Sequence, residues 1–326
     1  MKEEEIRPKA IFDEYLRLAA QDTETYFGEA ERFSIDCPAC GTIGEFTFEK
    51  SGFKYEVCPN CASLYVSPRP LADAFNQYYQ NSPSSKYWAS TFYKQTAGAR
   101  REKLWKPKAK QILEIIKSHM EVEWPTIIDI GGGYGLFAEE IGLLTQTSPL
   151  VIEPGPHLAD VCRSKGLKVV EKFLEDIALE DLPADANFFV SFELFEHLHD
   201  PGLFLRHLAG LMKSGDMFTF TTLSGTGADI QALWENSKSV SPPHHLNFLN
   251  PYAAKLLVEA SGLEIVEIST PGKLDVDILI NNQSDIKDRF WKSFVTFASY
   301  SQKKSCQSWL AENGWSSHMW VTCRKA

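Results

Sequence analysis

The sequence predicts an α/β fold: a Rossmann-like, seven-stranded, mostly parallel sheet with helices on both faces, preceded by a small cysteine-bearing segment. Residues 126–154 combine a β-branched run, a glycine cluster, an amphipathic segment and a second apolar run. Short apolar runs then alternate with helical patterns as far as residue 270, which is typical of a doubly wound sheet. Two C-x2-C pairs lie upstream and indicate a separate small unit.

The rest of the chain is organised around residues 126–154. The run 126–130 lies between Pro125 and the glycines 131–133, as expected of a short strand buried on both faces. Apolar residues then recur at helical spacing, namely Leu136, Phe137, Ile141 and Leu144. The glycines therefore lie in a strand-to-helix turn, where they allow positive φ and let a ligand approach the backbone. Residues 149–153 predict the next parallel strand, which brings Glu153 to the same edge of the sheet.

The glycine spacing argues against a dinucleotide, because the fingerprint G-x-G-x-x-G/A fails at Leu136. The spacing found here is Asp129-x-Gly131-x-Gly133-x-Gly135. It resembles the first motif of class I S-adenosylmethionine (SAM) dependent methyltransferases, and Glu153 matches the acid that ends their second strand. A structural turn, or a site for another nucleotide, is the alternative, because short glycine motifs alone are weak signals.

The resemblance implies a set of cofactor contacts. Gly131, Gly133 and Gly135, which follow Asp129, would lie against the methionine part of SAM. Glu153 would accept hydrogen bonds from both ribose hydroxyls, each worth roughly 1.5–3 kcal/mol because the acceptor is charged. Asp176 follows the third strand, where the family places a residue near the adenine. SAM is therefore the expected cofactor.

The four cysteines upstream form the pattern C-x2-C-x17-C-x2-C, with Cys37, Cys40, Cys58 and Cys61 as its members. This spacing is typical of a zinc site, and four thiolates complete a tetrahedral Zn²⁺ with no open position. The zinc is therefore expected to be structural. Metal binding of roughly 10–16 kcal/mol would supply the folding energy that so small a segment lacks. A redox pair of dithiols is the alternative.

Composition limits the class of protein. The chain has 326 residues, a formal net charge of −10 and a hydrophobic share of 44%, which is typical of a soluble globular protein. It contains no apolar run near the roughly 20 residues of a membrane span, and its first residues are unlike a signal peptide, so a cytoplasmic location is expected. The negative charge argues against a sequence-independent grip on nucleic acid.

These patterns divide the chain into four parts. The expected parts are an N-terminal helical extension (1–34), a zinc ribbon (35–66), a helical connector and substrate-side segment (67–120), and a SAM-binding domain (121–326) with a helical insert (271–315). The connector is rich in aromatic residues, which either line a substrate mouth or pack between domains. Its basic run at 94–110 predicts a solvated helix face or an attraction for a phosphorylated substrate.

Two stretches carry the candidate catalytic residues. Glu193, Glu196 and His197 follow the fourth strand and resemble the E-x-x-E-H string of small-molecule methyltransferases, some of which hold a divalent cation there. Two carboxylates and an imidazole could bind such a cation or polarise an acceptor hydroxyl; the alternative is that they only fix the loop. His244 and His245 lie on a proline-stiffened loop that resembles the acceptor border of bacterial sugar methyltransferases. His245 is the predicted general base and His244 the second choice, with a loop anchor as the alternative.

The predicted function is methyl transfer from SAM to a small-molecule acceptor, a sugar or nucleotide-linked sugar of surface-polysaccharide or secondary metabolism. The zinc segment resembles those that precede the catalytic domain in some bacterial sugar methyltransferases. One rival is an RNA methyltransferase that uses the ribbon to bind RNA, and the other is a non-catalytic zinc-bearing adaptor. The insert, with apolar residues at helical spacing, is expected to form a lid, a homodimer surface or both.

Overall fold

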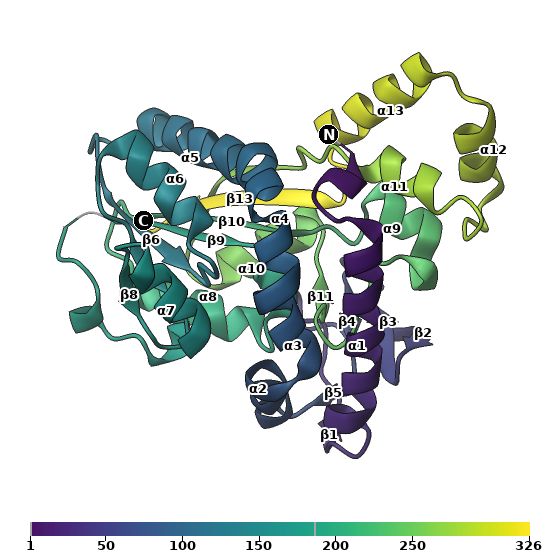
Figure 1. Cartoon of the computed structure of the whole chain (residues 1–326), viewed down its shortest axis with the longest axis horizontal. Helices are drawn as coiled ribbons and strands as arrows, with labels where there is room; N and C mark the ends of the chain where they lie inside the picture. The colour runs from purple at the N-terminus through teal and green to yellow at the C-terminus, as the bar shows by residue number, and fades with distance from the viewer. Residues whose placement is uncertain (1, 186) are drawn as a thin grey trace.

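The computed structural model describes residues 2–185 and 187–326. Its central sheet has the strand order β12-β13-β10-β9-β6-β7-β8 (Figure 1). The strands are β6 (Thr126–Ile130), β7 (Leu150–Ile152), β8 (Lys168–Val170), β9 (Asn187–Phe192), β10 (Met217–Leu223), β12 (Glu264–Ser269) and β13 (His318–Arg324). Strands β6 to β10 run parallel, whereas β13 is antiparallel to both β10 and β12. The predicted fold class is therefore confirmed, including the reversed last strand.

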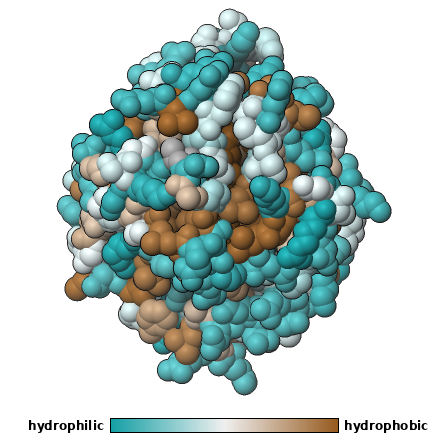
Figure 2. Space-filling view, turned by 90° about the vertical axis from the view of Figure 1, so that its left-hand side faces the viewer, coloured by the Kyte–Doolittle hydropathy of each residue, from teal (hydrophilic) through white to brown (hydrophobic). Residues whose placement is uncertain are grey.

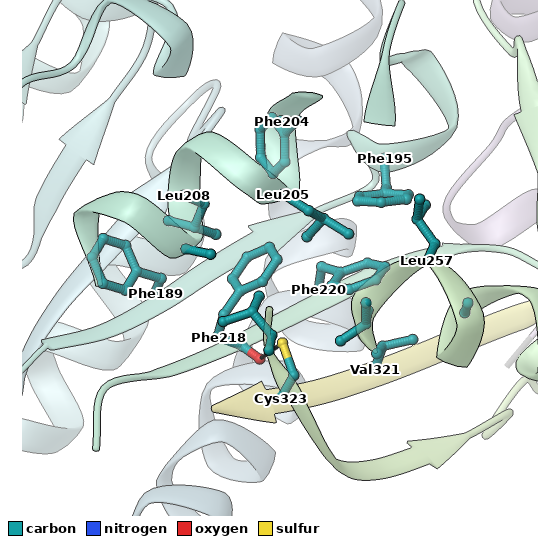
Figure 3. Packing of buried hydrophobic residues seen from close by; sticks show 14 of the residues in the cluster. Phe189, Phe195, Phe204, Leu205, Leu208, Phe218, Phe220, Leu257, Val321 and Cys323 are labelled. Atoms are coloured by element: carbon teal, nitrogen blue, oxygen red, sulfur yellow. Dashed lines mark hydrogen bonds between the residues drawn. The ribbon is translucent and has the colours of Figure 1, made fainter. Parts of the chain in front are cut away.

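Helices cover both faces of this sheet because successive strand residues point in opposite directions. The covering helices are α5 (Lys106–His119), α6 (Leu136–Thr145), α7 (Pro156–Ser164), α8 (Pro201–Leu211) and α10 (Pro251–Ala260). On one face, Phe189 and Phe218 pack with Phe204 and the other apolar residues of α8, as Figure 3 shows. Phe188 belongs to the cluster on the opposite face, together with residues of α5 and α6. The site-bearing strand ends are thus held by two apolar layers.

The cysteine segment forms a second, four-stranded antiparallel sheet with the order β11-β4-β3-β2. Its strands are β2 (Glu45–Lys50), β3 (Phe53–Val57), β4 (Leu64–Val66) and β11 (Asn247–Phe248). Strand β11 comes from the stretch that the sequence assigned to the SAM-binding domain, and the sequence did not predict this exchange. Strands β1 (Arg32–Phe33) and β5 (Arg69–Pro70) form a separate antiparallel pair.

The N-terminal helix α1 (Lys9–Phe27) lies within the stretch 1–34 that the sequence indicates as a helical extension. Its last turn continues because Phe27 is fully buried against Phe53, Phe75 and Tyr78. The aromatic end of the helix thus packs on the ribbon, a tertiary contact that no local sequence signal indicates.

The connector is helical over most of its length. It contains α2 (Ala72–Asn81), α3 (Pro83–Tyr87), a π-helical turn (Trp88–Phe92), α4 (Tyr93–Arg100), a second π-helical turn (Arg101–Trp105) and the start of α5. Phe92 is fully buried in a cluster with Phe12 and Tyr15 of α1, and Figure 1 shows α1 and α3 side by side. Most of the connector's aromatic residues therefore pack between elements, whereas Tyr79 remains 40% exposed.

The insert extends away from the sheet at the upper right of Figure 1. It consists of α11 (Asp275–Asn281), α12 (Arg289–Phe297) and α13 (Tyr300–Glu312), and α9 (Ala228–Leu233) packs beside α11. The described residues also include short 3-10 turns at Glu3–Glu5, Leu174–Asp176, Leu179–Asp181, Phe195–His197 and Trp234–Asn236. Figure 2 shows the side where α6 and α7 lie, with apolar residues gathered near its centre inside a hydrophilic surround. Within the described residues, no helix is both long and apolar enough to span a membrane.

Candidate active site

The glycine turn between β6 and α6 adopts the backbone that its sequence predicts. Gly131, Gly133 and Gly135 have φ values of +70°, +54° and +66°, in the region that favours glycine. A Cβ on Gly131 would come within 2.9 Å of the Leu194 side chain, whereas a Cβ on Gly133 would meet no described atom within 4 Å. The turn is therefore close to the 193–197 loop on one side and open on the other.

Glu153, at the end of β7, is tied to this turn. Its Oε2 accepts a hydrogen bond from the Gly133 N–H at 2.9 Å, and its Oε1 accepts one from the Gly155 N–H at 2.9 Å. Burial raises the pKa of Glu153, and the two backbone donors act against that shift. Each carboxylate oxygen keeps a further lone pair, so the group can still accept hydrogen bonds from a diol.

Asp129 lies under the turn and is only 2% exposed. Its Oδ2 has no hydrogen-bond partner among the described residues. Burial, followed by the nearby Glu153, raises the pKa of Asp129 to about 7. A buried carboxylate without a partner is costly, and a cationic ligand group would relieve that cost. The open glycine turn, the diol acceptor and this carboxylate fit the ammonium and ribose of SAM.

Asp176 is the least integrated of the predicted cofactor residues. It ends the 3-10 turn Leu174–Asp176, and its side chain is exposed. No hydrogen bond among the described residues connects its side chain to the glycine turn or to Glu153. The structure therefore places Asp176 at the surface after β8 and adds nothing to its predicted adenine contact.

Glu193 follows β9 with φ +54°, an uncommon backbone for a residue with a side chain. Its Oε1 accepts hydrogen bonds from Lys108 Nζ at 2.7 Å, Thr221 Oγ1 at 3.1 Å and His318 Nε2 at 3.1 Å. Burial would raise the pKa of Glu193, but Lys108 and His318 lower it well below the ordinary value. The neighbouring basic residues Lys108 and His318 therefore keep the Glu193 side chain ionised.

The structure brings together a different trio from the predicted Glu193, Glu196 and His197. One ligand atom each from Glu196, His197 and His245 lies within 4.8 Å of the others. Glu196 is 2% exposed, and its Oε2 accepts a hydrogen bond from Thr222 Oγ1 at 3.0 Å. Burial and the neighbouring Glu193 raise the pKa of Glu196 to about 8. Glu193 lies outside this cluster, and its Oε1 contacts Lys108, Thr221 and His318 instead.

The two histidines of the 241–248 loop have different surroundings. His245 Nδ1 lies 2.5 Å from the Ser239 carbonyl oxygen, so Nδ1 carries the proton and Nε2 keeps a free lone pair. Burial lowers the pKa of His245 to about 4. His244 is 5% exposed, and its Nε2 is 2.6 Å from the Tyr78 hydroxyl. His244 is therefore engaged with a buried partner, and His245 is the histidine with a nitrogen available to a ligand.

The four cysteines converge as the spacing predicts. The Sγ atoms of Cys37 and Cys61, and of Cys40 and Cys58, are 3.4 Å apart, and those of Cys40 and Cys61 are 3.6 Å apart. These distances are far longer than a disulfide bond. They approach the roughly 3.8 Å between sulfurs of a tetrahedral Zn²⁺ with bonds of about 2.3 Å. The donor set and its spacing fit a zinc ion.

The basic run at 94–110 is only in part the solvated face that the sequence predicted, because Lys94, Lys103 and Lys110 are exposed whereas Arg100 and Lys108 are buried. Arg101 pairs with Glu139 and Glu140, and the Lys108 side chain is only 8% exposed. Lys106 pairs with Glu102 and Lys103 with Glu5. Because most of this charge is neutralised within the chain, the run offers little attraction to a phosphorylated substrate.

Sequence reasoning missed Lys108 and His318 as partners of Glu193. Lys108 was one member of a long basic run, and nothing local distinguishes the lysine that turns inward. His318 begins β13, which lies next to β10 only because the last strand inserts between β10 and β12. The one available signal for His318 was its position at the end of a strand, on the edge of the sheet where the parallel strands end and ligands bind.

The parallel sheet, the open glycine turn and the acid at the end of β7 define an α/β enzyme with a nucleoside cofactor at the carboxyl edge of its strands. Residues 94–268 match the family described as a methyltransferase domain, which covers more than half of the chain. The chain belongs to this family, and it is a SAM-dependent methyltransferase.

Curated relatives carry the same kind of name. The ubiquinone biosynthesis O-methyltransferase of Xanthomonas euvesicatoria pv. vesicatoria (strain 85-10) is 25% identical over 169 residues, which cover 48% of this chain and 70% of that protein. The protein of the same name from Xanthomonas axonopodis pv. citri (strain 306) is 26% identical over 168 residues, with the same coverage. The plantazolicin methyltransferase BpumL, solved in complex with SAH, has a TM-score of 0.50 at 11% identity and covers 77% of this chain and 93% of its own. That last likeness supports the fold.

Proposed function

We propose that this enzyme transfers the methyl group of SAM to a hydroxyl oxygen of a small molecule, with a sugar or nucleotide-linked sugar as the acceptor class. The observation that carries the proposal is the trio of Glu196, His197 and His245, whose ligand atoms lie within 4.8 Å of one another. The loop that bears Glu196 also contains Leu194, which lies against the glycine turn. An acceptor beside the trio would therefore be near the bound cofactor.

The trio fits a divalent cation. One carboxylate and two imidazoles are a common donor set for first-row metals with open positions. His245 also has the outer hydrogen bond typical of metal-ligating histidines, because its Nδ1–H donates to the Ser239 carbonyl while Nε2 stays free. A cation held there would polarise an acceptor hydroxyl and lower its pKa. This arrangement supports His245 as a ligand in preference to the general base predicted from the sequence.

The remaining residues would bind and orient. Bound SAM supplies an activated methyl carbon on a positively charged sulfur. Asp129, the glycine turn and Glu153 would fix the cofactor, and the loop of Glu196 and His197 would fix the acceptor oxygen, so that the two reacting atoms are aligned. Tyr79 is 40% exposed, and its hydroxyl lies 3.5 Å from His197 Nδ1. Its ring would form an aromatic wall beside the acceptor.

Oxygen is the proposed methyl acceptor for a second reason. The Xanthomonas relatives are named as O-methyltransferases in ubiquinone biosynthesis. A phenolic hydroxyl is therefore the second acceptor class to be tested beside sugars. Either class could present its oxygen to a cation at the trio.

The ribbon region has few basic side chains free to contact RNA phosphates, which argues against the RNA-methyltransferase alternative. Arg69 is 1% exposed, and Lys50 Nζ donates to the Ser237 carbonyl at 2.8 Å. Arg32 lies over the Phe53 ring and donates to a backbone carbonyl. Of the basic residues in the ribbon region, these three are committed to packing, so the ribbon has a poor track for a phosphate backbone.

We also propose that the cysteine cluster holds a structural Zn²⁺ and that the insert forms a homodimer contact. The groove between α12 and α13 has a volume of about 620 Å³ and is lined by Phe290, Phe294 and Phe297. Phe290 and Phe297 are 67% and 83% exposed, which is unusual for aromatic side chains of a monomer. The same aromatic stripe on a second copy would match this groove in a two-fold arrangement.

The test is turnover of SAM with a panel of sugars, nucleotide-linked sugars and phenols, with and without added divalent cations. Glu196→Gln should lower the rate by roughly 10²-fold or more, because it removes an anionic ligand from the polarising site. His119→Gln, at an exposed position in the last turn of α5, is the control and should leave the rate unchanged. A metal-independent enzyme that tolerates Glu196→Gln would contradict the proposal.

A further inference from the structure

The loop that carries His245 runs directly into the ribbon. Residues 247 and 248 form β11, which pairs with β4 through the registers Asn247 with Tyr65 and Phe248 with Leu64. The Val66 N–H also donates to the Leu246 carbonyl at 2.9 Å. The histidine loop therefore ends as an edge strand of the four-stranded ribbon sheet.

Tyr55 makes a direct contact with the histidine itself. Its hydroxyl donates to the His245 carbonyl oxygen at 2.8 Å. The ring is fully buried and packs with Phe48 and Phe248, so the hydroxyl has a fixed direction. A central strand of the ribbon thus holds the backbone of a residue in the trio.

Arg69 connects the two loops that supply the trio. Its guanidinium is 1% exposed and donates to the His199 carbonyl, to the Leu246 carbonyl at 3.4 Å and to Asn247 Oδ1 at 2.9 Å. The loops are also joined directly, because the Leu246 N–H donates to the Glu196 carbonyl at 2.8 Å. No carboxylate among the described residues pairs with Arg69, so its donors hold backbone carbonyls and the Asn247 side chain in place.

We infer that the four-cysteine ribbon is a positioning unit for the acceptor site, with Tyr55 and Arg69 as the residues that set His245 against Glu196 and His197. The inference rests on the proposed function of this trio. Tyr55 acts through a backbone carbonyl, and Arg69 acts through backbone carbonyls and the Asn247 side chain. Neither residue needs to touch SAM, the acceptor or a cation. The ribbon would then be required for catalysis without contacting the reacting atoms.

The physical reason is the small tolerance of such sites. A ligand set must be held to within a fraction of an ångström, and the residues that orient a metal ligand typically matter 10–100-fold for metal affinity. The 241–248 loop has only short secondary structure of its own. Its geometry therefore depends on the ribbon sheet and on Arg69.

The test compares Tyr55→Phe with Tyr65→Phe in the full-length, zinc-loaded protein. Both rings are fully buried in the ribbon sheet, but the Tyr65 hydroxyl donates to Glu56 and not to the histidine loop. Tyr55→Phe should weaken Co²⁺ binding at the trio by roughly tenfold. It should also speed amide hydrogen exchange in residues 241–248, while zinc content and SAM affinity stay unchanged. Tyr65→Phe should match the wild type in all four measurements.

Arg69→Lys is the second variant, because lysine keeps the charge but cannot reach three acceptors at once. It should speed exchange in both loops, 193–200 and 241–248. Equal exchange and equal Co²⁺ affinity in Tyr55→Phe and Tyr65→Phe would overturn the inference. If the wild type binds no Co²⁺ at the trio, the proposed cation site fails, and the exchange comparison alone decides whether the ribbon positions the loop.

Discussion

The side-chain amide of Asn250 donates a hydrogen bond to the Cys61 carbonyl oxygen at 2.6 Å. Through Oδ1, the same side chain caps helix α10 by accepting from the Ala253 N–H at 2.9 Å. One asparagine therefore joins a cysteine of the ribbon to a helix that covers the central sheet. Through this connection, loss of the proposed Zn²⁺ would also destabilise the catalytic domain.

Removal of zinc should consequently destabilise the whole chain. Chelation, or Cys58→Ser, should lower the melting temperature in a single transition, because the proposed Zn²⁺ would supply roughly 10–16 kcal/mol to a segment with a small core of its own. Differential scanning calorimetry together with metal analysis by mass spectrometry measures this. Cys306→Ser, outside the cluster, is the control. A separate, early transition that leaves the main one unmoved would show that the ribbon is not coupled to the sheet.

Much of this fold follows from local sequence patterns. Glycine clusters, apolar runs and cysteine spacing are short-range signals, so the strands, the turn at Gly131 and the cysteine cluster could be predicted. The exchange of β11 into the ribbon could not, because a two-residue strand at Asn247–Phe248 has no periodicity to detect. The pairing of Glu193 with Lys108 has the same cause, since it joins residues 85 positions apart. The residue types of the candidate site could therefore be predicted from the sequence, but the residues that contact them could not.

Glu153→Gln tests the cofactor site. The substitution keeps the volume but loses the charged acceptor for the ribose hydroxyls, so SAM affinity should fall by at least tenfold, given roughly 1.5–3 kcal/mol for each such bond. Isothermal titration calorimetry measures the change. Glu180→Gln, on an exposed turn, is the matched control and should bind SAM as the wild type does. Unchanged binding by Glu153→Gln would remove Glu153 from the cofactor site.

Asp129 makes stability without SAM depend on pH. Its pKa is raised from 3.8 to about 7 in the folded protein, so burial penalises the charged form. The penalty is absent below about pH 4, where the group is protonated in both states, grows as pH rises, and is complete above about pH 7. Asp129→Asn should therefore raise the free energy of unfolding at pH 8, by up to about 4 kcal/mol at 1.36 kcal/mol per pKa unit.

The measurement is urea unfolding of the SAM-free protein at pH 8 and at pH 4.5. The gain of Asp129→Asn should shrink at the lower pH, and the variant should bind SAM more weakly because it lacks a partner for the cofactor's ammonium. An equal effect of the substitution at both pH values would exclude the carboxylate charge as its cause.

Phe297→Asp tests the proposed homodimer contact. A charge in the groove between α12 and α13 would oppose burial of the aromatic stripe, so the variant should be monomeric in sedimentation at concentrations where the wild type is a dimer. Leu143→Asp is the control, because Leu143 is 74% exposed on α6, far from the insert (Figure 1). A wild type that stays monomeric throughout would refute the contact.

Lys108 and Glu193 form a largely buried ion pair at 2.7 Å, with Lys108 8% and Glu193 31% exposed. Lys108→Met should destabilise the protein by about 3–5 kcal/mol, because it leaves a carboxylate with His318 as its remaining basic partner. The double variant Lys108→Met/Glu193→Gln should recover much of that loss, since it removes the unpaired charge as well. Chemical unfolding of the two single variants and the double variant gives the coupling energy. Additive effects would mean that Lys108 acts by packing on Trp105 and Phe192 rather than by holding Glu193 ionised.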